Sequence, residues 1–553
     1  MDKDLIYGRE FLKEGSTGDI MVQVDGFKPY HQGQTMLLPL SVSDFVPDNH
    51  KARFISTVVD KMDLTNLYTT YCTTHGQNAY DPRMLVKVLF YSTFMGVFSS
   101  REIENKLHTD TAFMYLAAMQ KPTYRTINRF RSRFFDELVP LFEQIIKICQ
   151  DLNLIGLNHI AFDGTKIKAN ASPKKSLNKQ QLERRIKKLL GKSIRTDAEE
   201  DEIFGTGTPF TIPEEYAQDP ELMKKIEGLV EAYNRLTESG ETRTNLTDED
   251  ANVMKLKQMT LPAYNFQTAV DEKSQIIVAA DVTTEETDHH QLIPMVKQVQ
   301  HNTSRKPTVI SADPGYATYD NYEYLKNNEL FALIPDSMHF IETHGRTKYY
   351  PKSQFFYNPD NDSYTCPSGR RMHFVRIQRD KKKLPLRLYQ GNCSWCPLHL
   401  SCTKSSQRSI TRHPQEELKD AMRGRLATPE GKKEYAKRIT VAEAPFGNMK
   451  VNKRWNQLNH RGLKKVKGEC LLHAIGHNLG VICKNVSIDR IESLESIQIL
   501  SNSCENLIAT PFYPPMFGQG CAPEAFFEDR YGELMENWIW IRDPDRGLGL
   551  ICS

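Results

Sequence analysis

The chain has 553 residues, 39% of them apolar and 25% charged, and a formal net charge of +3. This length can supply two or three domains with cores of their own, and the composition is that of a soluble globular protein. No apolar run approaches the roughly 18–20 residues of a membrane-spanning helix, which excludes a helical membrane protein. No N-terminal stretch has the layout of a signal peptide, so we expect a cytoplasmic protein.

Helical patterns begin at residue 51, after residues 1–50, which show no clear periodicity. We expect a helical region over 51–153, in which the segment 124–152 opens with four arginines and continues as an apolar stripe. The arginines are Arg125, Arg129, Arg131 and Arg133. Several short helices with one arginine-rich member are typical of a helix-turn-helix-like DNA-binding module. An ordinary helical bundle with a solvated basic face fits the same pattern.

After residue 155 the pattern changes to short β-branched and aromatic runs bounded by Gly, Pro, Asp or Asn. It predicts three strands, a helix, a strand, a helix and a strand. The expected strands are 157–164, 263–271, 275–283, 305–315 and 330–335, and the expected helices are 289–302 and 319–329. This order predicts an α/β fold, a mixed five-stranded sheet with flanking helices.

Two insertions interrupt this predicted domain, which spans residues 154–485 and ends in a helix. Residues 171–250 contain a basic amphipathic helix at 178–192 followed by polar loop, and residues 335–437 are polar and carry several cysteines. Residues 486–553 are rich in Pro, Gly and aromatic residues without a clear pattern. We therefore treat them as a separate tail of unknown role.

Two of the predicted strands carry a carboxylate at their carboxyl-terminal edge. Asp163 follows the run Ile-Ala-Phe, and Asp313 follows Val-Ile-Ser-Ala. A third acid, Glu443, lies on a predicted helix among basic residues. Ligand sites in sheets with α/β units concentrate at such edges. Three converging carboxylates suit two Mg²⁺ ions in phosphoryl transfer, although one such Asp alone is usually a turn residue.

Three stretches around these acids resemble the signature regions of bacterial insertion-sequence transposases of the DDE class. They are FDGTKIKANAS, ADPGYAT and AEAPFGNMK. The similarity is to the branch named for insertion sequence 1182. It extends to NAYDPRMLVKVLFYSTFMGVFSSREIE and PTYRTINRFRSRF upstream, and to CPSGRRM, CSWCPLHLSC and HRGLKKVKGECLLHAIGHNL downstream. Together these stretches lie within residues 40–485.

The resemblance implies an RNase H-like catalytic core in which Asp163, Asp313 and Glu443 bind two Mg²⁺ or Mn²⁺ ions. It implies a transposase that hydrolyses a phosphodiester at the transposon end and joins the released 3′-hydroxyl to target DNA. It further implies a homodimer on the paired ends and association with the bacterial nucleoid. The arginine-rich helix would read the terminal inverted repeat.

The family's Tyr–Arg–Glu–Lys signature maps onto Tyr435, Arg438, Glu443 and Lys450. The spacing between the Arg and the Glu is four residues here, where related branches have three. By the same resemblance, the basic residues of this region would bind end phosphates rather than read bases. They are Arg438, Lys450, Lys453 and Arg454.

The eleven cysteines are an odd number, and four lie close together in the sequence. Cys393 and Cys396 form a CxxC pair, Cys402 follows six residues later and Cys366 precedes them. Without an export signal, such a cluster favours a reducing compartment and metal ligation over a disulfide scaffold. Four thiolates suit a tetrahedral structural Zn²⁺ ion, while free structural cysteines fit the pattern as well. A histidine could replace a cysteine as ligand, the candidates being His373, His399 and His413.

Two other functions are compatible with the sequence. A metal-dependent nuclease on the same core would cut DNA without joining it, and a catalytically inactive or repurposed DNA-binding protein would keep the helical region. The presence of all three acids favours an active enzyme. The pair His289 and His290 precedes a helix for which Asp288 is a natural cap, which favours a structural role for the two histidines over an acid–base role.

Overall fold

The computed structural model describes most of the chain between residues 41 and 496 and two short strands near its end. The described residues are 41–69, 79–190, 220–240, 242–256, 258–343, 345, 347–379, 384–496, 538–543 and 547–552. They fall into two units, Met1–Gln498 and Ile499–Ser553. In the second unit, β14 (Trp538–Asp543) and β15 (Gly547–Cys552) form an antiparallel hairpin. Most of the segment 1–50 and of the tail 486–553 lies outside the described residues.

The described part of residues 42–151 is helical. It contains η1 (Val42–Phe45), α1 (Lys51–Asp60), α2 (Thr65–Thr69), α3 (Pro82–Met95), α4 (Ser100–Thr109), α5 (Thr111–Leu116), α6 (Tyr124–Phe134) and α7 (Leu138–Asp151). The segment 124–152 forms two helices, the arginine-rich α6 and the apolar α7. Phe134 and Phe135 are both buried but pack on different partners, Phe90 and His460 respectively. The chain changes direction between α6 and α7, which allows each ring to pack against its own partner.

A six-stranded mixed sheet forms the centre of the first unit. Its strands are β1 (His159–Lys168), β4 (Asn252–Leu256), β5 (Met259–Asp271), β6 (Ile277–Thr283), β7 (Val309–Ala312) and β8 (Ala332–Leu333). Strand β5 is antiparallel to β1, β4 and β6, whereas β7 is parallel to β1 and β8. The five predicted strands are present. The prediction of five strands was wrong by one, because β4 extends the sheet from a stretch between the insertion and β5 for which no element was predicted.

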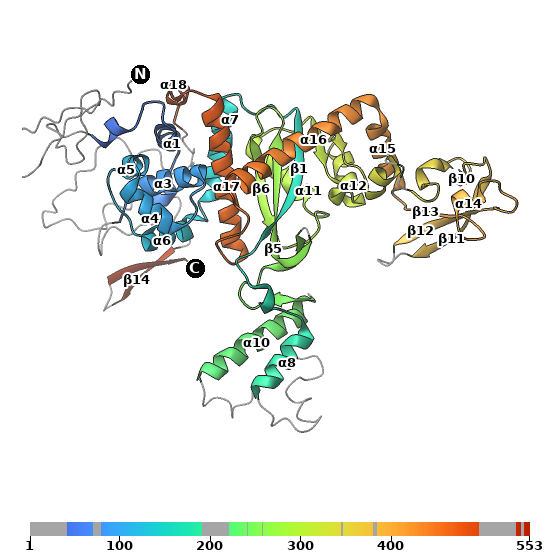
Figure 1. The fold of residues 1–553 in the computed structure, drawn as a ribbon, viewed down its shortest axis with the longest axis horizontal. Coiled ribbons are helices and arrows are strands. Elements are labelled where there is room, and N and C mark those ends of the chain that lie inside the picture. Colours follow the sequence, from blue (N-terminus) through green and yellow to red (C-terminus); the bar gives the residue numbers. More distant parts are fainter. Residues whose placement is uncertain are drawn as a thin grey trace, which may run out of the picture. The chain divides into compact units, whose positions relative to one another are not determined.

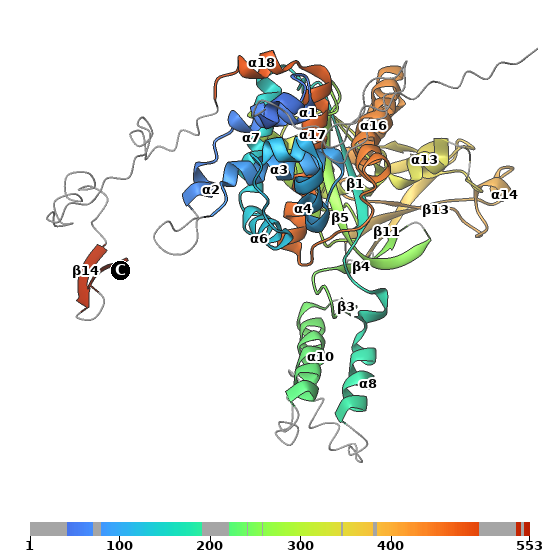
Figure 2. The ribbon, with the colours of Figure 1, turned by 60° about the vertical axis from the view of Figure 1, so that its left-hand side comes forward.

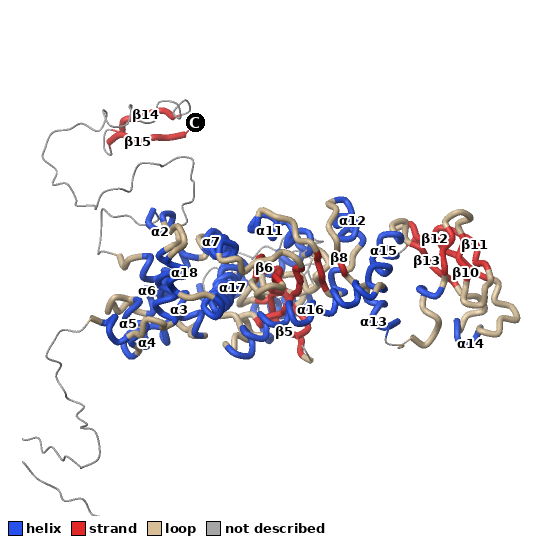
Figure 3. The backbone as a smooth tube through the Cα atoms, turned by 90° about the horizontal axis from the view of Figure 1, so that it is seen from above, coloured by secondary structure: helices blue, strands red, loops and turns tan. Residues whose placement is uncertain are grey.

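Helices cover both faces of this sheet. Figure 3 shows the strands between α11 (Leu292–Thr303) and α16 (Pro429–Gly447). Helix α12 (Tyr319–Asn327) packs beside α11, and α16 crosses the sheet over β1, β5 and β7 (Figure 1). A π-helical turn, η6 (Asn448–Asn452), directly follows α16. Strands β7 and β8, which follow the helices α11 and α12 in the chain, lie on one side of β1, and β4, β5 and β6 lie on the other.

The long helix α17 (Leu463–Asn485) joins the sheet to the helical region, because it packs on β6 and also on α3 and α7. Its Asn478 is fully buried and forms hydrogen bonds with the backbone of Ile277 in the edge strand β6. The side-chain oxygen accepts from the Ile277 N–H at 2.9 Å, and the side-chain nitrogen donates to the Ile277 carbonyl at 2.9 Å. Neither α17 nor any other described helix is apolar enough over a sufficient length to cross a membrane.

The insertion at 171–250 forms a helical hairpin with a small core of its own. Helix α8 (Lys179–Leu190) lies beside α10 (Pro220–Ser239), as Figure 2 shows, and the short strands β2 (Ser176–Leu177) and β3 (Thr244–Asn245) pair at its base. The predicted basic helix is α8. The expectation of polar loop after it was wrong for α10, whose apolar residues recur at helical spacing. They are Ile226, Leu229, Val230, Tyr233 and Leu236.

A second, separate sheet occupies the insertion at 335–437. Its strands, in spatial order, are β13 (Ser409–Arg412), β12 (Pro385–Gly391), β11 (Arg371–Arg379), β10 (Ser363–Thr365) and β9 (Phe356–Asn358). The helices α13 (Ser337–Thr343), α14 (His399–Cys402) and α15 (Glu416–Ala427) accompany them. All neighbouring strands from β9 to β13 pair antiparallel, with a register shift between Phe374 and Arg376 of β11. The insertion is therefore a folded module rather than a loop.

Replacing Asn478 with Ala should destabilise the fold by roughly 2–4 kcal/mol, because both backbone groups of Ile277 lose their partner in a buried place. Denaturant unfolding measures this. The matched control is Asn485→Ala on the same helix, whose exposed side chain bonds only the Val481 carbonyl. That change should stay within about 0.5 kcal/mol. Equal effects of the two substitutions would contradict the role assigned to Asn478.

Candidate active site

The parallel pairing of β1 with β7 brings two of the predicted acids together. Phe162 of β1 is the partner of Ala312, the last residue of β7, so Asp163 and Asp313 leave the shared ladder side by side. Strand β1 does not end at Asp163, as the sequence led us to expect. It continues to Lys168 against β5. Asp163 therefore stands on a continuous strand at the point where its parallel neighbour turns away.

A third carboxylate at this place is Asp288, which lies between β6 and α11. Its Oδ1 accepts hydrogen bonds from Asn265 Nδ2 at 2.7 Å and Gln267 Nε2 at 2.6 Å. The expectation that Asp288 caps the following helix was wrong, because the residue at that position is Gln291. Asn265 and Gln267 lie two residues apart on the buried part of strand β5. Such polar residues at every second position of a buried strand were the signal in the sequence for this network.

Two glycines make room for the Asp288 carboxylate. A Cβ at Gly164 would clash with Gln267 and lie 2.7 Å from Asp288 Oδ1. A Cβ at Gly315 would lie 2.9 Å from Asp313 Oδ1 and 3.0 Å from Asp288 Oδ2. These separations are too short for carbon–oxygen contacts, so a larger residue at either position would displace the neighbouring carboxylates and amides. The glycines that follow Asp163 and Asp313 in sequence thus allow the three carboxylates to lie close together.

Burial raises the pKa of both strand-edge acids, and neighbouring negative charge raises it further. Burial raises the pKa of Asp163 to about 7, with further increases from Asp313 and Asp288 and an opposing effect of Arg438. The pKa of Asp313 is raised by burial first and by Asp288 second, and is lowered in part by its hydrogen bond from the Gly315 N–H. A cation placed among these groups would remove the repulsion that raises both pKa values.

Helix α16 is held on the sheet by a charged network at the start of β1. The ring of His159 is fully buried, with Nδ1 at 2.9 Å from Glu434 Oε1 and Nε2 at 2.6 Å from Ser311 Oγ. Lys437 bridges Glu434 and Glu272 at 3.0 and 2.8 Å. His159, Glu272 and Glu434 bring three possible metal ligands within 4.8 Å. The Lys437 ammonium forms ion pairs with both carboxylates, so we interpret the group as an ion-pair network that docks α16.

Docking of α16 places Arg438 and Tyr435 against the carboxylates. Arg438 Nη1 lies 3.9 Å from Asp163 Oδ1, with 14% of its side chain exposed, and its guanidinium lies 5.9 Å from the centre of the Tyr435 ring. Arg438 Nε and Nη1 are buried without a hydrogen-bond partner among the described residues, as is Oγ1 of Thr268, opposite Asp163 on β5. Buried polar atoms without partners are costly. Their position indicates a site built to receive a polar ligand.

The residues present fit a hard divalent cation. Asp163 and Asp313 offer carboxylate oxygens, the ligand type that Mg²⁺ and Mn²⁺ prefer. The excess of acids over the single Arg438 leaves net negative charge for a cation to balance.

The third predicted acid, Glu443, is not brought to this cluster. Its side chain is exposed and makes no hydrogen bond or ion pair with any described residue. Glu443 follows Arg438 by five residues, which turns it about 140° around the helix axis. Lys450, further along, does reach β1, where its ammonium donates to Thr165 Oγ1 at 2.5 Å and to the Lys166 carbonyl at 3.1 Å.

The remaining basic residues divide into exposed and buried ones. Arg125, Arg129 and Arg133 are exposed on α6, and Arg454 is exposed after η6. Arg131 is only 6% exposed and donates to the Phe98 carbonyl at 3.0 Å, which corrects its assignment as a DNA-binding residue.

Two further polar residues donate hydrogen bonds to backbone carbonyls of the protein. Lys453 donates to the Gly476 carbonyl at 3.1 Å, and burial lowers its pKa to about 8. His289 donates from Nδ1 to the Gly315 carbonyl at 2.7 Å and so holds the turn after Asp313, a structural role as predicted. These contacts leave Lys453 less available to DNA than Arg454.

Two protein-family models match parts of the chain. One, described as "Transposase DDE domain", matches residues 365–483, and the other, described as "Transposase domain (DUF772)", matches residues 40–133. Together they indicate a transposase of the DDE family. Such transposases are metal-dependent enzymes that cleave DNA, so DNA and a divalent metal are the implied partners. No curated protein matches the chain.

The two matches cover different parts of the chain. The first spans part of the second sheet together with α14 to α16 and most of α17, and the second spans η1 and α1 to α6. Asp163 and Asp313 lie in neither segment. Their assignment therefore depends on the geometry of β1 and β7.

The metal-free protein should lose stability as pH rises through about 7. The folded state raises the pKa of Asp163 from its usual 3.8 to about 7, so folding favours the protonated form. The contribution of Asp163 to the free energy of unfolding is complete below about pH 4 and is lost above about pH 7. About 1 kcal/mol of it is lost between roughly pH 6.5 and 8. Denaturant unfolding with chelator present measures it. Asp163→Asn should remove this part of the dependence, and an unchanged profile would contradict the assignment.

Proposed function

We propose that the chain is the transposase of a bacterial insertion sequence of the 1182 branch. It would bind the terminal inverted repeats, hydrolyse a phosphodiester at each end and join the released 3′-hydroxyl to target DNA. It would do so as a homodimer on the paired ends. The observation that carries the proposal is the meeting of Asp163 and Asp313 where β1 and β7 part, under the basic helix α16.

An RNase H-like core is the fold that we propose for residues 154–485. The sheet order β6-β5-β1-β7-β8 supports it, as do the antiparallel position of β5 and the parallel pairing of β1, β7 and β8. The helical region before it would hold the ends, and the two folded insertions would be additions to the core.

In this proposal Asp163 and Asp313 hold two Mg²⁺ or Mn²⁺ ions. The bound ions would lower the pKa of the attacking water and balance charge on the phosphodiester. Arg438, whose buried nitrogens lack partners, would donate to the phosphate beside Asp163. Lys450, attached to the next residues of β1, would fix the position of the strand under the DNA backbone.

We propose Glu443 as the third ligand, which requires the end of α16 to rearrange when DNA binds. Pro445 lies inside this helix and the π-helical turn η6 follows, and both features weaken the regular hydrogen bonding there. Asp288 is the competing candidate because it already lies beside Asp163 and Asp313. Its Oδ1 is occupied by two amides, which suits a positioning group better than a ligand.

Neutral replacements of the acids test the site. Asp163→Asn, Asp313→Asn and Glu443→Gln should each lower Mg²⁺- or Mn²⁺-dependent cleavage and joining of the element's own ends by roughly 100-fold or more. End binding should persist, because the same changes leave the helical region intact. The matched control is Asp320→Asn, an exposed acid on α12, which should leave the rate unchanged.

The pattern of loss distinguishes the alternatives. Activity retained in Glu443→Gln but lost in Asp288→Asn would make Asp288 the third ligand. Cleavage without joining in the unmodified protein would make the chain a nuclease, and binding without cleavage would make it an inactive DNA-binding protein. Activity retained in Asp163→Asn or Asp313→Asn would overturn the proposed site.

The exposed arginines of α6 should contribute to DNA affinity through phosphates. Replacing Arg125, Arg129 and Arg133 with Gln one at a time should weaken end binding and reduce the salt dependence by about one counterion per contact. Arg131→Gln should instead lower stability, since Arg131 is buried against the Phe98 carbonyl. Binding titrations at several salt concentrations measure the first effect, and unfolding measures the second. Unchanged DNA binding in all three exposed-arginine variants, together with weaker binding but unchanged stability in Arg131→Gln, would contradict the proposal.

A further inference from the structure

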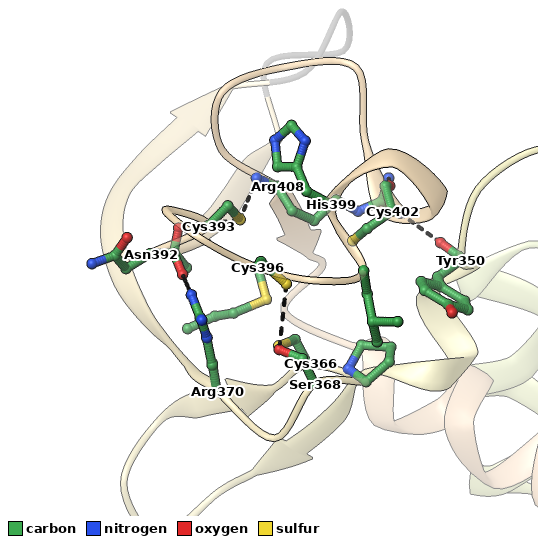
Figure 4. A pocket seen from close by; sticks show the side chains of 14 residues that line it. Tyr350, Cys366, Ser368, Arg370, Asn392, Cys393, Cys396, His399, Cys402 and Arg408 are labelled. Carbon is green, nitrogen blue, oxygen red and sulfur yellow. Dashed lines mark hydrogen bonds between the residues drawn. The ribbon is translucent and has the colours of Figure 1, made fainter.

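Four cysteines meet in the second sheet module, which is distinct from the candidate active site. Cys366 follows β10, Cys393 and Cys396 follow β12, and Cys402 ends α14. All four line one cavity of about 20 Å³. Figure 4 shows their side chains arranged around this space, with Ser368 and Arg370 below and Arg408 behind. Three separate segments of the chain thus present thiols to a volume that suits a single small ion.

The module has only a small apolar core among its described residues. Its own core consists of six buried residues, one of them a cysteine of this set. They are Phe355, Tyr364, Met372, Tyr389, Cys402 and Ile410. A core of this size seldom stabilises a fold without a disulfide or a metal ion. The cysteines of the module are free thiols in the structure, which leaves a metal ion as the missing element.

The backbone around the cysteines forms two tight turns that face the cavity. In the first, the Gly369 N–H donates to the Cys366 carbonyl at 2.8 Å, with Gly369 at φ 77°. In the second, the Cys396 N–H donates to the Cys393 carbonyl at 3.3 Å, with Trp395 at φ 55° and 97% exposed. A left-handed tryptophan that points into solvent gains nothing from burial. Its conformation is explained if the turn serves to direct the two flanking thiols inward.

Arg370 and Arg408, which also line the cavity, support these turns. The Arg370 guanidinium donates to the carbonyls of Asn392, Ser394 and Trp395 at 3.1, 2.7 and 3.3 Å. The Arg408 backbone N–H donates to Cys393 Sγ at 3.3 Å. An N–H directed at sulfur stabilises the thiolate, the form that binds metals. Outer hydrogen bonds of this kind orient ligands in metal sites.

From this geometry we propose that Cys366, Cys393, Cys396 and Cys402 bind one structural Zn²⁺ ion. Four soft thiolates suit Zn²⁺ in a closed tetrahedral site with no position for substrate. The four sulfur atoms are not yet at ligand spacing, since the one described group with three ligand atoms within 4.8 Å is elsewhere. Side-chain rotation about the cavity would bring them onto the ion.

Of the described histidines of the module, only His399 lines the cavity. Its Nε2 donates to the Ser405 carbonyl at 3.0 Å, which leaves Nδ1 as its one possible ligand atom. His373 is exposed on β11 and does not line the cavity. His413 stacks on Tyr319 at 3.7 Å between ring centres.

Metal analysis of the full chain purified under reducing conditions tests the site. We expect one zinc per chain, and a Co²⁺-substituted protein with the absorption of tetrahedral four-thiolate coordination. Cys393→Ser and Cys396→Ser should each bring zinc from one per chain to near zero. The matched control Cys483→Ser, on α17, and His399→Ala should both retain one zinc. None of these readouts depends on transposition.

The spectrum of the unmodified Co²⁺ protein does not depend on how the variants fold, and it reports the number of thiolates directly. Zinc retained in both Cys393→Ser and Cys396→Ser would overturn the proposal. So would a metal-free chain that fails to bind added Zn²⁺ or Co²⁺, a Cys393–Cys396 disulfide, or iron in place of zinc.

Discussion

The parallel pairing of β1 with β7 is the constraint on which the candidate site depends. Only four residues of each strand pair, from His159 with Val309 to Phe162 with Ala312. Because both strands run the same way, Asp163 and Asp313 emerge at the same level of the sheet. An antiparallel arrangement would have placed them at opposite ends. The long partner β5 supports β1 beyond this point, so Asp163 is held on a rigid strand.

The second requirement is a helix that covers the carboxylates without filling the site. The network of His159, Glu434, Lys437 and Glu272 fixes α16 at the start of β1, and Lys450 fixes the segment after it near Thr165. Between these two attachments the helix presents Arg438 to Asp163. Burial of the acids and of this arginine creates a region of low dielectric in which added charge interacts strongly.

The cysteine module illustrates a different principle, the stabilisation of a small sheet. Its turns hold thiols toward a cavity instead of building a larger apolar core. The module ends where α15 leads into α16, the helix that covers the candidate active site. A stably folded module would therefore help to hold α16 in place. One chain would thus bind a structural ion through thiolates and catalytic ions through carboxylates.

The sequence by itself determined the local elements and two of the site residues. Apolar residues at strand and helix spacing identify β1, β5, β6, β7, α11 and α17, and an acid after an apolar run identifies Asp163 and Asp313. Local spacing shows that a face is buried but not which element covers it. Only the tertiary structure decided that Arg131 is buried while Arg129 is exposed, because α6 packs on α4 through that side. Likewise Asp288 joins the cluster, and Glu443 faces away from it, because of how β5 and α16 are placed on β1.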